Sequence, residues 1–413
     1  MTTRTIPDVR PERSRTQLVA GALCWVTVVL EGYDLVTLGA VIPTLLETKH
    51  LGMTPADATL IATLSLVGVG LGAATVGPLA DRLGRRVSLI GSIVLFSVLT
   101  ALLPLAPSVA TFAALRLLAG LGLGACMPTA LTIMSEVTPA RHRAKATTIT
   151  MTGYHTGAVL TSLLALAVIP NWQVLFYAGG VIGLLIVPVM WFTLPESSPV
   201  VTEGARARVP LSTVVRPPYL RASLGAWVAS FMGLLLVYGL NTWLPTIMRE
   251  AGYQLGAALT MLFILNLGAV AGLLVSGWVG DTRGIKRSGV VWFGLAAVFL
   301  ALLSIKMESS LLLDIAIFFT GVFVFSAQVL VYALVAHLFQ PAVRGTALGL
   351  SSGIGRLGAI IGPAVTGALV TAGIAYPWGF YFFALVAVLA VGAVIAMPAH
   401  LDEDADEVAP VAR

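Results

Sequence analysis

The amino-acid sequence predicts an all-α membrane protein with about twelve transmembrane helices in two six-helix bundles. Composition is the first observation: 58% of the 413 residues are hydrophobic and 10% are charged, against about 25% charged residues in soluble domains. The mean hydropathy of +0.95 agrees. The second is a series of apolar segments, each close to the roughly 20 residues that span a bilayer. The third is a set of motifs repeated at an offset near 200 residues.

Charged or proline-rich breaks separate the apolar segments. The first six lie at 18–45, 58–80, 87–103, 111–134, 146–168 and 174–194, and the second six at 222–248, 256–279, 288–305, 311–338, 345–371 and 378–397. The chain therefore divides into an N-terminal arm (1–17), an N-terminal bundle (18–194), a central linker (195–221), a C-terminal bundle (222–397) and an acidic tail (398–413).

Lysine and arginine residues predict the orientation. With the N-terminus in the cytoplasm, 19 of the 24 fall in cytoplasmic segments and three in external loops, while Arg116 and Arg356 fall inside spans. Cytoplasmic loops of membrane proteins carry an excess of these residues. We therefore expect both termini in the cytoplasm and the linker and tail on the same side.

The two halves of the chain repeat each other. The segment 77–84 aligns with 277–284, and Pro43-Thr44 aligns with Pro245-Thr246. Two repeated six-helix halves with a substrate site between them, near the membrane midplane, are typical of secondary transporters.

The first span contains two carboxylates, Glu31 and Asp34. An ionised acid in the middle of a spanning helix costs about 2.5 to 3.5 kcal/mol on insertion scales, so such residues face a cavity or a partner and mark transport paths. Three residues apart, the two acids share one helix face, where one of them can hold a proton. The alternative is a salt bridge that only holds helices together.

Two further polar residues lie inside spans at equivalent places. Arg356 is surrounded by glycines, which let a helix or ligand come close, and its guanidinium can bind a carboxylate through two parallel hydrogen bonds. A structural ion pair with Glu31 or Asp34 is the alternative. His155 lies 201 residues earlier, at the matching place in the first half, and histidine titrates near neutral pH; core packing is its alternative.

Several motifs resemble the major facilitator superfamily. The run Gly77-Pro-Leu-Ala-Asp81-Arg82-Leu-Gly84-Arg85-Arg86 resembles its loop between spans two and three, and Leu115-Arg116-Leu-Leu-Ala-Gly120-Leu-Gly-Leu-Gly124 resembles its span-four motif. Glu31-Gly-Tyr-Asp34 is similar to the Asp-Gly-x-Asp motif of the aromatic acid:proton symporters. Tyr238-Gly-Leu-Asn241-Thr-Trp243-Leu-Pro245 and Gly353-Ile-Gly355-Arg356-Leu-Gly358 resemble the seventh and eleventh spans of that family.

The resemblance implies roles for individual residues. We expect proton coupling to involve Asp34, Glu31, Arg116 and His155. Asp34 is the expected main carrier because it matches the motif, whereas Glu31 stands where the family has Asp. For Arg116 a purely structural contact is the alternative.

Substrate binding is expected at Arg356 and at aromatic or polar side chains of the spans, which can form a wall and hydrogen bonds for a ring. Packing is the alternative for each of them. These residues are Tyr33, Tyr154, Asn241, Trp243, Gln328, Tyr332 and, near the cytoplasmic end of its span, His337.

The charged loop residues have a different expected role. By resemblance, Asp81, Arg82, Arg85 and Arg86, with Asp281 in the second half, form a gate latch that stabilises the outward-facing state. We do not expect Asp81 to contact substrate.

The sequence contains no P-loop, no metal-ligand spacing and no nucleophile elbow, so no enzymatic activity, metal or cofactor other than the coupling proton is expected. The arginines lie in short clusters between apolar runs, which argues against nucleic acid as a partner. The expected partners are the lipid bilayer and a small aromatic carboxylate, and the expected location of the chain, as a monomer, is a bacterial plasma membrane.

We therefore predict a proton-coupled transporter that imports an aromatic carboxylate, of the benzoate or hydroxybenzoate type, by alternating access. One alternative is a proton-coupled drug or other organic-anion transporter of the same superfamily, although a buried guanidinium suits an anion. The alternative from another class is a transporter-like membrane sensor.

Overall fold

The computed structural model describes residues 15–139, 142–195, 211–340 and 343–401. Twelve helices of this part are long and apolar enough to cross a membrane. The first six are α1 (Arg15–Glu47), α2 (Pro55–Leu83), α3 (Arg85–Leu102), α4 (Val109–Val137), α5 (Arg143–Val168) and α6 (Gln173–Thr193). The second six are α7 (Leu220–Glu250), α8 (Leu255–Arg283), α9 (Ile285–Leu303), α10 (Ser310–Leu338), α11 (Arg344–Thr371) and α12 (Ala375–Ala396).

The predicted fold class is confirmed. Each predicted apolar segment overlaps one helix, and the described residues contain no strand. Three short 3₁₀ helices accompany them: η1 (His50–Gly52), η2 (Leu103–Leu105) and η4 (Leu211–Thr213). Most of the predicted arm, linker and tail lies outside the described residues.

The helix ends reproduce the sequence repeat. Ser108 and Ser309 occupy equivalent places before α4 and α10, and each side chain accepts a hydrogen bond from a backbone N–H of the first turn. Gly84 and Gly284 connect α2 to α3 and α8 to α9 with φ of 89° and 87°, a region that favours glycine. The repeated glycine of the loop motif is thus required by the turn itself.

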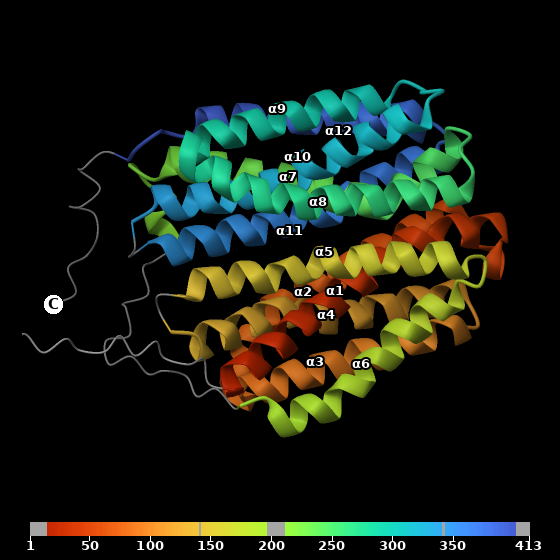
Figure 1. Ribbon diagram of the computed structural model, residues 1–413, viewed down its shortest axis with the longest axis horizontal. Coiled ribbons are helices and arrows are strands. Elements are labelled where there is room, and N and C mark those ends of the chain that lie inside the picture. Colours follow the sequence, from red (N-terminus) through yellow and green to blue (C-terminus); the bar gives the residue numbers. More distant parts are fainter. Residues whose placement is uncertain (1–14, 140–141, 196–210, 341–342, 402–413) are drawn as a thin grey trace, which may run out of the picture.

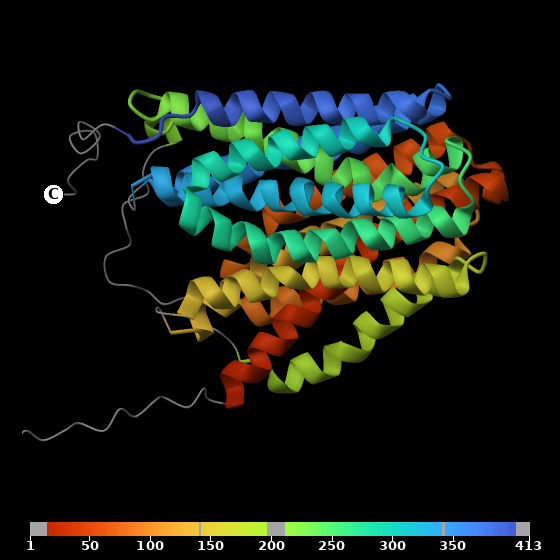
Figure 2. The ribbon, with the colours of Figure 1, turned by 45° about the horizontal axis from the view of Figure 1, so that its top comes forward.

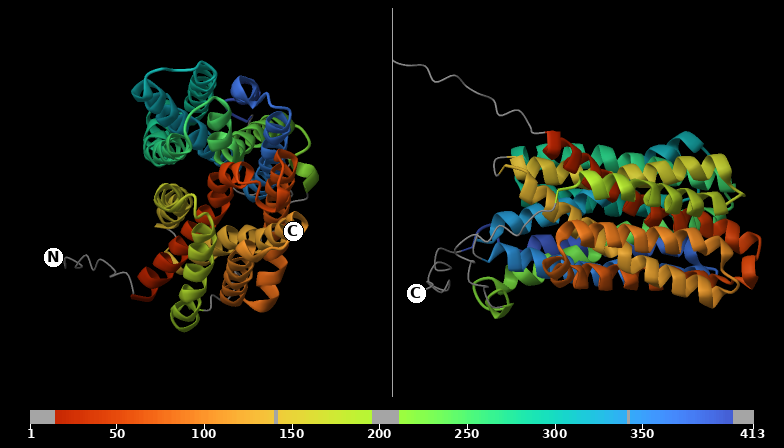
Figure 3. Two further views of the ribbon diagram at one scale, coloured as in Figure 1. Left: turned by 90° about the vertical axis from the view of Figure 1, so that its right-hand side faces the viewer. Right: turned by 90° about the horizontal axis from the view of Figure 1, so that it is seen from below.

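Each half packs its helices in the same way. The most extensive contacts within a half join α1 to α5 and α2 to α4, and the equivalent α7 to α11 and α8 to α10. Figure 1 shows α1–α6 (red to yellow-green) on one side and α7–α12 (green to blue) on the other, and Figure 3 separates them when viewed along the helices.

The most extensive contacts between the halves join α1 to α7, α2 to α11 and α5 to α8. The pairs α2–α11 and α5–α8 correspond to each other, because the sequence repeat relates α2 to α8 and α5 to α11. Figures 1 and 2 both show α5 running beside α8. A residue in the middle of α1, α5, α7, α10 or α11 can therefore take part in a site between the halves.

The halves are closed at one end. At the end marked by Glu47, hereafter the Glu47 end, Arg249 Nε donates to Glu47 Oε1 at 2.7 Å across the two halves. Nearby, a Cβ added to Gly39 of α1 would overlap the carbonyl oxygen of Asn241 of α7, and one added to Gly367 of α11 would overlap Thr59 of α2. Backbones of opposite halves are thus in direct contact here.

The opposite end, hereafter the Arg85 end, lacks these tight contacts. A Cβ added to Gly77 of α2 or Gly277 of α8 would meet no atom within 4 Å, and the same holds for Gly349 and Gly353 of α11. The hydrogen bonds of Arg85 to Glu136 and of Arg86 to the carbonyl of Trp191, both at this end, lie within the N-terminal half. The halves therefore converge toward the Glu47 end.

Candidate functional site

The two acids of α1 have different surroundings. Asp34 accepts hydrogen bonds from Arg116 Nη1 of α4 at 2.5 Å and from Thr100 Oγ1 of α3 at 2.5 Å. Asp34, Arg116 and Thr100 are each at most 1% exposed. Asp34 thus forms the salt bridge that was the alternative to a transport role, and this pair lies wholly inside the N-terminal half.

Glu31 has no such partner. Its side chain is 0% exposed, and neither carboxyl oxygen has a hydrogen-bond partner among the described residues. The positive charge that acts on it belongs to Arg356, on α11 of the other half, beyond the distance of an ion pair. A buried carboxylate without a partner is costly when ionised and much less so when protonated, so this position suits a neutral acid.

Glycine explains why α1 and α5 come so close at this point. A Cβ at Gly32 would overlap the carbonyl oxygen of Tyr154, and one at Gly157 would overlap that of Val29. The glycine between Glu31 and Asp34 thus brings Tyr154 next to the acids.

Arg356 lies where the two halves face each other. It is partly buried, and its Nη1 donates to the hydroxyl of Tyr238 on α7 at 3.1 Å. No carboxylate lies within ion-pair distance of it in the part of the chain that the structure describes. The alternative reading of Arg356, a structural ion pair with Glu31 or Asp34, is therefore not seen, and the guanidinium keeps donors for another anion.

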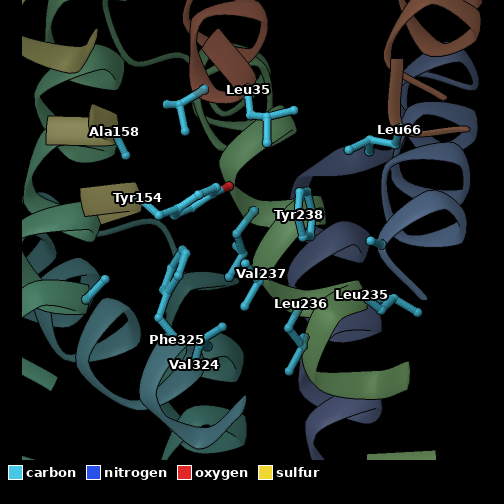
Figure 4. Packing of buried hydrophobic residues seen from close by; sticks show 14 of the residues in the cluster. Leu35, Leu66, Tyr154, Ala158, Leu235, Leu236, Val237, Tyr238, Val324 and Phe325 are labelled. Carbon is cyan, nitrogen blue, oxygen red and sulfur yellow. The ribbon is translucent and has the colours of Figure 1, made fainter. Parts of the chain in front are cut away.

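Several aromatic rings lie beside Arg356. The rings of Tyr154 and Tyr238 contact edge-on with centroids 6.5 Å apart, Tyr154 contacts His155 at 5.2 Å, and His155 contacts Phe325 of α10 at 5.2 Å. Figure 4 shows Tyr154 extending from α5 toward Tyr238 and Val237, with Phe325 next to it. Rings from α5, α7 and α10 thus form one group across both halves, the aromatic group.

One face of α10 continues this site. Tyr332 lies two helical turns from Phe325 and interacts electrostatically with both Arg356 and Tyr238. Gln328 lies between them on the same face, is 4% exposed, and has no hydrogen-bond partner for either its Nε2 or its Oε1. The structure thus brings Glu31, Tyr154, His155, Tyr332 and Arg356 of the predicted site together, whereas the amide of Gln328 lies against α7 at Gly233.

Other predicted substrate residues lie elsewhere. Tyr33 points to α6, where its hydroxyl donates to the carbonyl of Leu175 at 2.9 Å. Trp243 is 0% exposed and donates to the carbonyl of Pro363 at 2.8 Å, joining α7 to α11. Both have the contacts of packing residues.

Two more predicted substrate residues lie away from the aromatic group. Asn241 accepts a hydrogen bond from Asn266 of α8 at 3.1 Å, close to the contact between α7 and α1. His337 is exposed in the last turn of α10. Neither contacts the aromatic group.

The predicted gating residues lie at the Arg85 end. Arg85 Nε donates to Glu136 of α4 at 2.7 Å, and Arg86 donates to the carbonyl of Trp191 and lies over its ring at 5.2 Å from the centroid. Arg82 and Asp281 are exposed, and the side chain of Asp81 is outside the described part. These contacts of Arg85 and Arg86 lie within the N-terminal half.

A small cavity of about 80 Å³ lies beside this loop, lined by Val76, Gly77, Ala80, Arg85, Pro128, Thr129 and Thr132. Its lining residues belong to α2, α3 and α4 and include none of the aromatic group. The described residues bring together no three His, Cys, Asp or Glu side chains that could hold a metal ion.

Sequence reasoning missed three residues of this region. Tyr238 was the first residue of a recognised motif, which was a usable signal. Phe325 and Thr100 stand in ordinary apolar surroundings of the sequence. Their contacts with His155 and Asp34 join helices far apart in the chain, so no local pattern could have found them.

Chemically, the site combines a guanidinium with free donors, a group of rings and a buried acid that is stable when neutral. An anion that carries an aromatic ring could bind to the guanidinium and pack against the group of rings. The acid can bind or release a proton next to it without any covalent chemistry.

Comparison with known proteins agrees with this architecture. The family model described as Major Facilitator Superfamily matches residues 24–306 and 264–412. The chain is 33% identical over 386 residues to a gentisate transporter of Corynebacterium glutamicum, covering 91% of this chain and 86% of the relative. It is 29% identical over 424 residues to a benzoate transport protein of Acinetobacter baylyi, covering 93% and 90%.

A solved structure supports the fold. The chain superposes on a D-xylose-proton symporter with a TM-score of 0.75 at 16% sequence identity, covering 92% of this chain and 97% of that one. The matched family model spans most of the sequence. The chain therefore belongs to the Major Facilitator Superfamily, and its curated relatives are transporters of aromatic acids.

Proposed function

We propose that the protein is a secondary transporter that imports an aromatic carboxylate together with protons across a bacterial plasma membrane. One observation carries the proposal: Arg356 lies between the halves with a neutral tyrosine as its hydrogen-bond partner and a group of aromatic rings beside it. The names of the relatives at about 30% identity support the same class of substrate.

Arg356 binds the carboxylate of the substrate in this proposal. A planar guanidinium matches a carboxylate through two parallel hydrogen bonds, and the hydroxyl of Tyr238 holds one side of it in place. The substrate ring packs against Tyr154 and Phe325, which belong to opposite halves. Binding thus depends on how closely the two halves approach.

Glu31 carries the proton in this proposal, rather than Asp34. The charge of Asp34 is neutralised by Arg116 and stabilised by Thr100, so protonating it would leave the Arg116 guanidinium buried without a partner. Protonating Glu31 removes an uncompensated charge instead. Position in the motif favoured Asp34, but the contacts favour Glu31.

A proton carried with the substrate offsets the electrical cost of moving an anion into the cell. Moving one negative charge into a cell costs about 2.3 kcal/mol per 100 mV of inside-negative potential. A proton carried on Glu31 cancels that charge, and each pH unit of gradient contributes about 1.36 kcal/mol. Neutral Glu31 also leaves the positive charge of Arg356 to the substrate.

The closed Glu47 end gives the direction of access. If both termini are cytoplasmic, as the lysine and arginine distribution predicts, the Glu47 end faces outward and the halves diverge toward the cytoplasm. The structure then corresponds to the inward-facing state. The predicted latch at Arg85 and Arg86 would form its contacts across the halves in the opposite, outward-facing state.

Uptake by purified protein in liposomes tests the proposal. With acid outside, labelled benzoate or hydroxybenzoates should accumulate, and Arg356→Lys should lose most uptake because a point ammonium cannot reproduce two parallel hydrogen bonds. Arg287→Lys, at an exposed position of α9, is the matched control and should transport normally.

Three results would contradict the proposal. Normal uptake by Arg356→Lys would remove Arg356 from the site. Binding of aromatic acids without accumulation would indicate a sensor. Accumulation of organic cations in place of acids would indicate a drug transporter of the same superfamily.

A further inference from the structure

We propose that the hydroxyl of Tyr154 makes substrate binding depend on the proton of Glu31. Its single O–H can donate to the ionised Glu31 carboxylate or to the substrate carboxylate at Arg356, but not to both. This inference rests on the proposed function, since it takes Glu31 as the proton carrier and Arg356 as the carboxylate site. It adds the residue that links these two groups across the halves.

The first step concerns the position of Tyr154. Its backbone lies against the turn of α1 that carries the acids, since a Cβ at Gly32 would overlap the carbonyl oxygen of Tyr154. From there its ring extends toward Tyr238 of α7 (Figure 4), and the two ring centroids are 6.5 Å apart. The side chain therefore begins beside the proton site in one half and reaches the hydrogen-bond partner of Arg356 in the other.

The second step concerns the hydroxyl itself. Tyr154 is 7% exposed, and its hydroxyl oxygen is buried without a hydrogen-bond partner in the described part of the chain. The side chain interacts electrostatically with Tyr238, Glu31 and Arg356. More than nine-tenths of buried polar groups in proteins are hydrogen-bonded, and exceptions call for an explanation such as a functional role. An unsatisfied hydroxyl thus lies within electrostatic reach of both the proton site and the anion site.

The third step concerns the groups that can use this hydroxyl. A phenol has one proton to donate, and its oxygen can also accept. Among the described residues Glu31 has no donor of its own, so its ionised form competes for the Tyr154 proton. Protonated Glu31 no longer needs that donor, and its own O–H can donate to the Tyr154 oxygen. The Tyr154 proton is then available to a carboxylate bound at Arg356.

Other ionisable groups surround Tyr154. Asp34 and Arg116 are paired with each other, and His155 contacts the Tyr154 ring edge-on. Histidine titrates near neutral pH, so a variant of Glu31 is needed to separate the two. Further groups on the packed helices are Cys126 of α4, Tyr332 of α10, and Asp281 and Arg283 at the end of α8.

Equilibrium binding of labelled benzoate to the purified protein, from about pH 6 to about pH 9, tests the inference, since a carboxylic acid is ionised throughout this range. In the wild type the Kd should rise with pH, by up to about tenfold per unit, because deprotonated Glu31 takes the Tyr154 proton. Tyr154→Phe keeps the ring. It should bind about tenfold or more weakly near pH 6 but within about twofold of the wild type near pH 9.

Three further variants provide the comparison. Tyr238→Phe removes the other hydroxyl at Arg356 and should weaken binding by the same factor at both ends of the pH range. Glu31→Gln should bind benzoate equally well at every pH, because its side chain cannot ionise. Tyr177→Phe, at an exposed position of α6, is the control and should keep the wild-type profile.

The ratio of the two Kd values is compared within each variant, so a partly unfolded sample does not change the outcome. Equal weakening at both pH values in Tyr154→Phe would overturn the inference, and so would a steep pH dependence in Glu31→Gln, which would assign the titration to a group such as His155. A flat wild-type profile with proton-driven uptake intact would overturn it and leave the proposed function standing. Binding of no aromatic acid by the wild type would contradict the proposed function itself.

Discussion

At the scale of single residues, two acids one helical turn apart differ because of what their neighbours supply. Asp34 has a guanidinium and a hydroxyl within 2.5 Å, whereas Glu31 has no hydrogen-bond partner among the described residues. A buried ion pair is strongly destabilised when one partner is removed, while an unpaired buried carboxyl loses little when it becomes neutral.

This difference predicts opposite outcomes for the two neutral variants. Glu31→Gln should fold normally but lose accumulation driven by a pH gradient, while it still exchanges labelled substrate across the membrane. Asp34→Asn should lower the free energy of unfolding by about 3 to 5 kcal/mol, because Arg116 is left buried and charged. Uptake and thermal unfolding of both purified variants, at matched expression, measure the difference.

A second substitution separates folding from chemistry. Asp34→Asn combined with Arg116→Gln removes both charges of the pair, so the double variant should be more stable than Asp34→Asn alone. Full accumulation by Glu31→Gln, together with a stable but uncoupled Asp34→Asn, would show that the proton travels on Asp34, as the motif alone suggests.

At the scale of helices, small residues determine which pairs pack most closely. The tight pairs α1–α5 and α7–α11 are equivalent in the two halves, and each has glycines facing a backbone carbonyl of the partner helix, at Gly157 and at Gly358. In a bilayer, where lipid is as apolar as leucine, such close packing is a main source of helix association. Tyr154 reaches the acids because of this spacing.

The packing predicts a selective effect of glycine substitutions. Gly157→Ala should destabilise the protein by roughly 1 to 3 kcal/mol and reduce transport, since its Cβ would overlap the carbonyl oxygen of Val29. Gly294→Ala in α9, where a Cβ meets nothing within 4 Å, is the matched control and should be neutral or slightly stabilising. Thermal unfolding in detergent compares them. Similar melting temperatures for both variants would argue against the close α1–α5 contact.

At the scale of the whole molecule, the two halves are held together at one end. Glu47 and Arg249 form the ion pair between halves there, and both side chains are partly exposed. An exposed pair contributes about 0 to 1 kcal/mol. A bias of that size shifts the population of facing states by a few fold and does not lock the transporter.

We therefore expect Glu47→Arg to move the population away from closure at the Glu47 end, because two arginines then face each other. The double variant Glu47→Arg with Arg249→Glu should restore it, since the charges are only exchanged. Accessibility of a cysteine introduced near Asn241 to a membrane-impermeant reagent reports the change, and high salt should weaken the effect. If the exchanged pair behaves like Glu47→Arg alone, the contact has another role.

Orientation in the membrane is the last prediction at this scale. A reporter fused after Val200, which lies outside the described residues, should be cytoplasmic, and one inserted near His50 at the Glu47 end should be external. Reporter activity in intact cells measures both. The reverse pair of results would invert the topology and with it the direction of access.

The sequence by itself determined the class of the molecule. Twelve apolar segments, the repeat and the charge distribution follow from local composition, because a bilayer requires long apolar helices whatever their neighbours are. The same is true of the repeated loop glycines and serine caps, whose roles depend on a single turn. Their charge inside apolar spans indicated Glu31, Asp34 and Arg356 as candidates, and the motif resemblance pointed to the same residues.

Only the tertiary structure decided which of these residues contact one another. Asp34 and Arg116 are 82 positions apart, and the contacts of Arg356 with Tyr238 and of His155 with Phe325 span larger distances along the chain. Such pairings depend on the rotation and spacing of packed helices, which no local pattern encodes. For that reason Tyr33 and Trp243, plausible from the sequence, contact other helices, while Phe325 contacts His155 of the aromatic group.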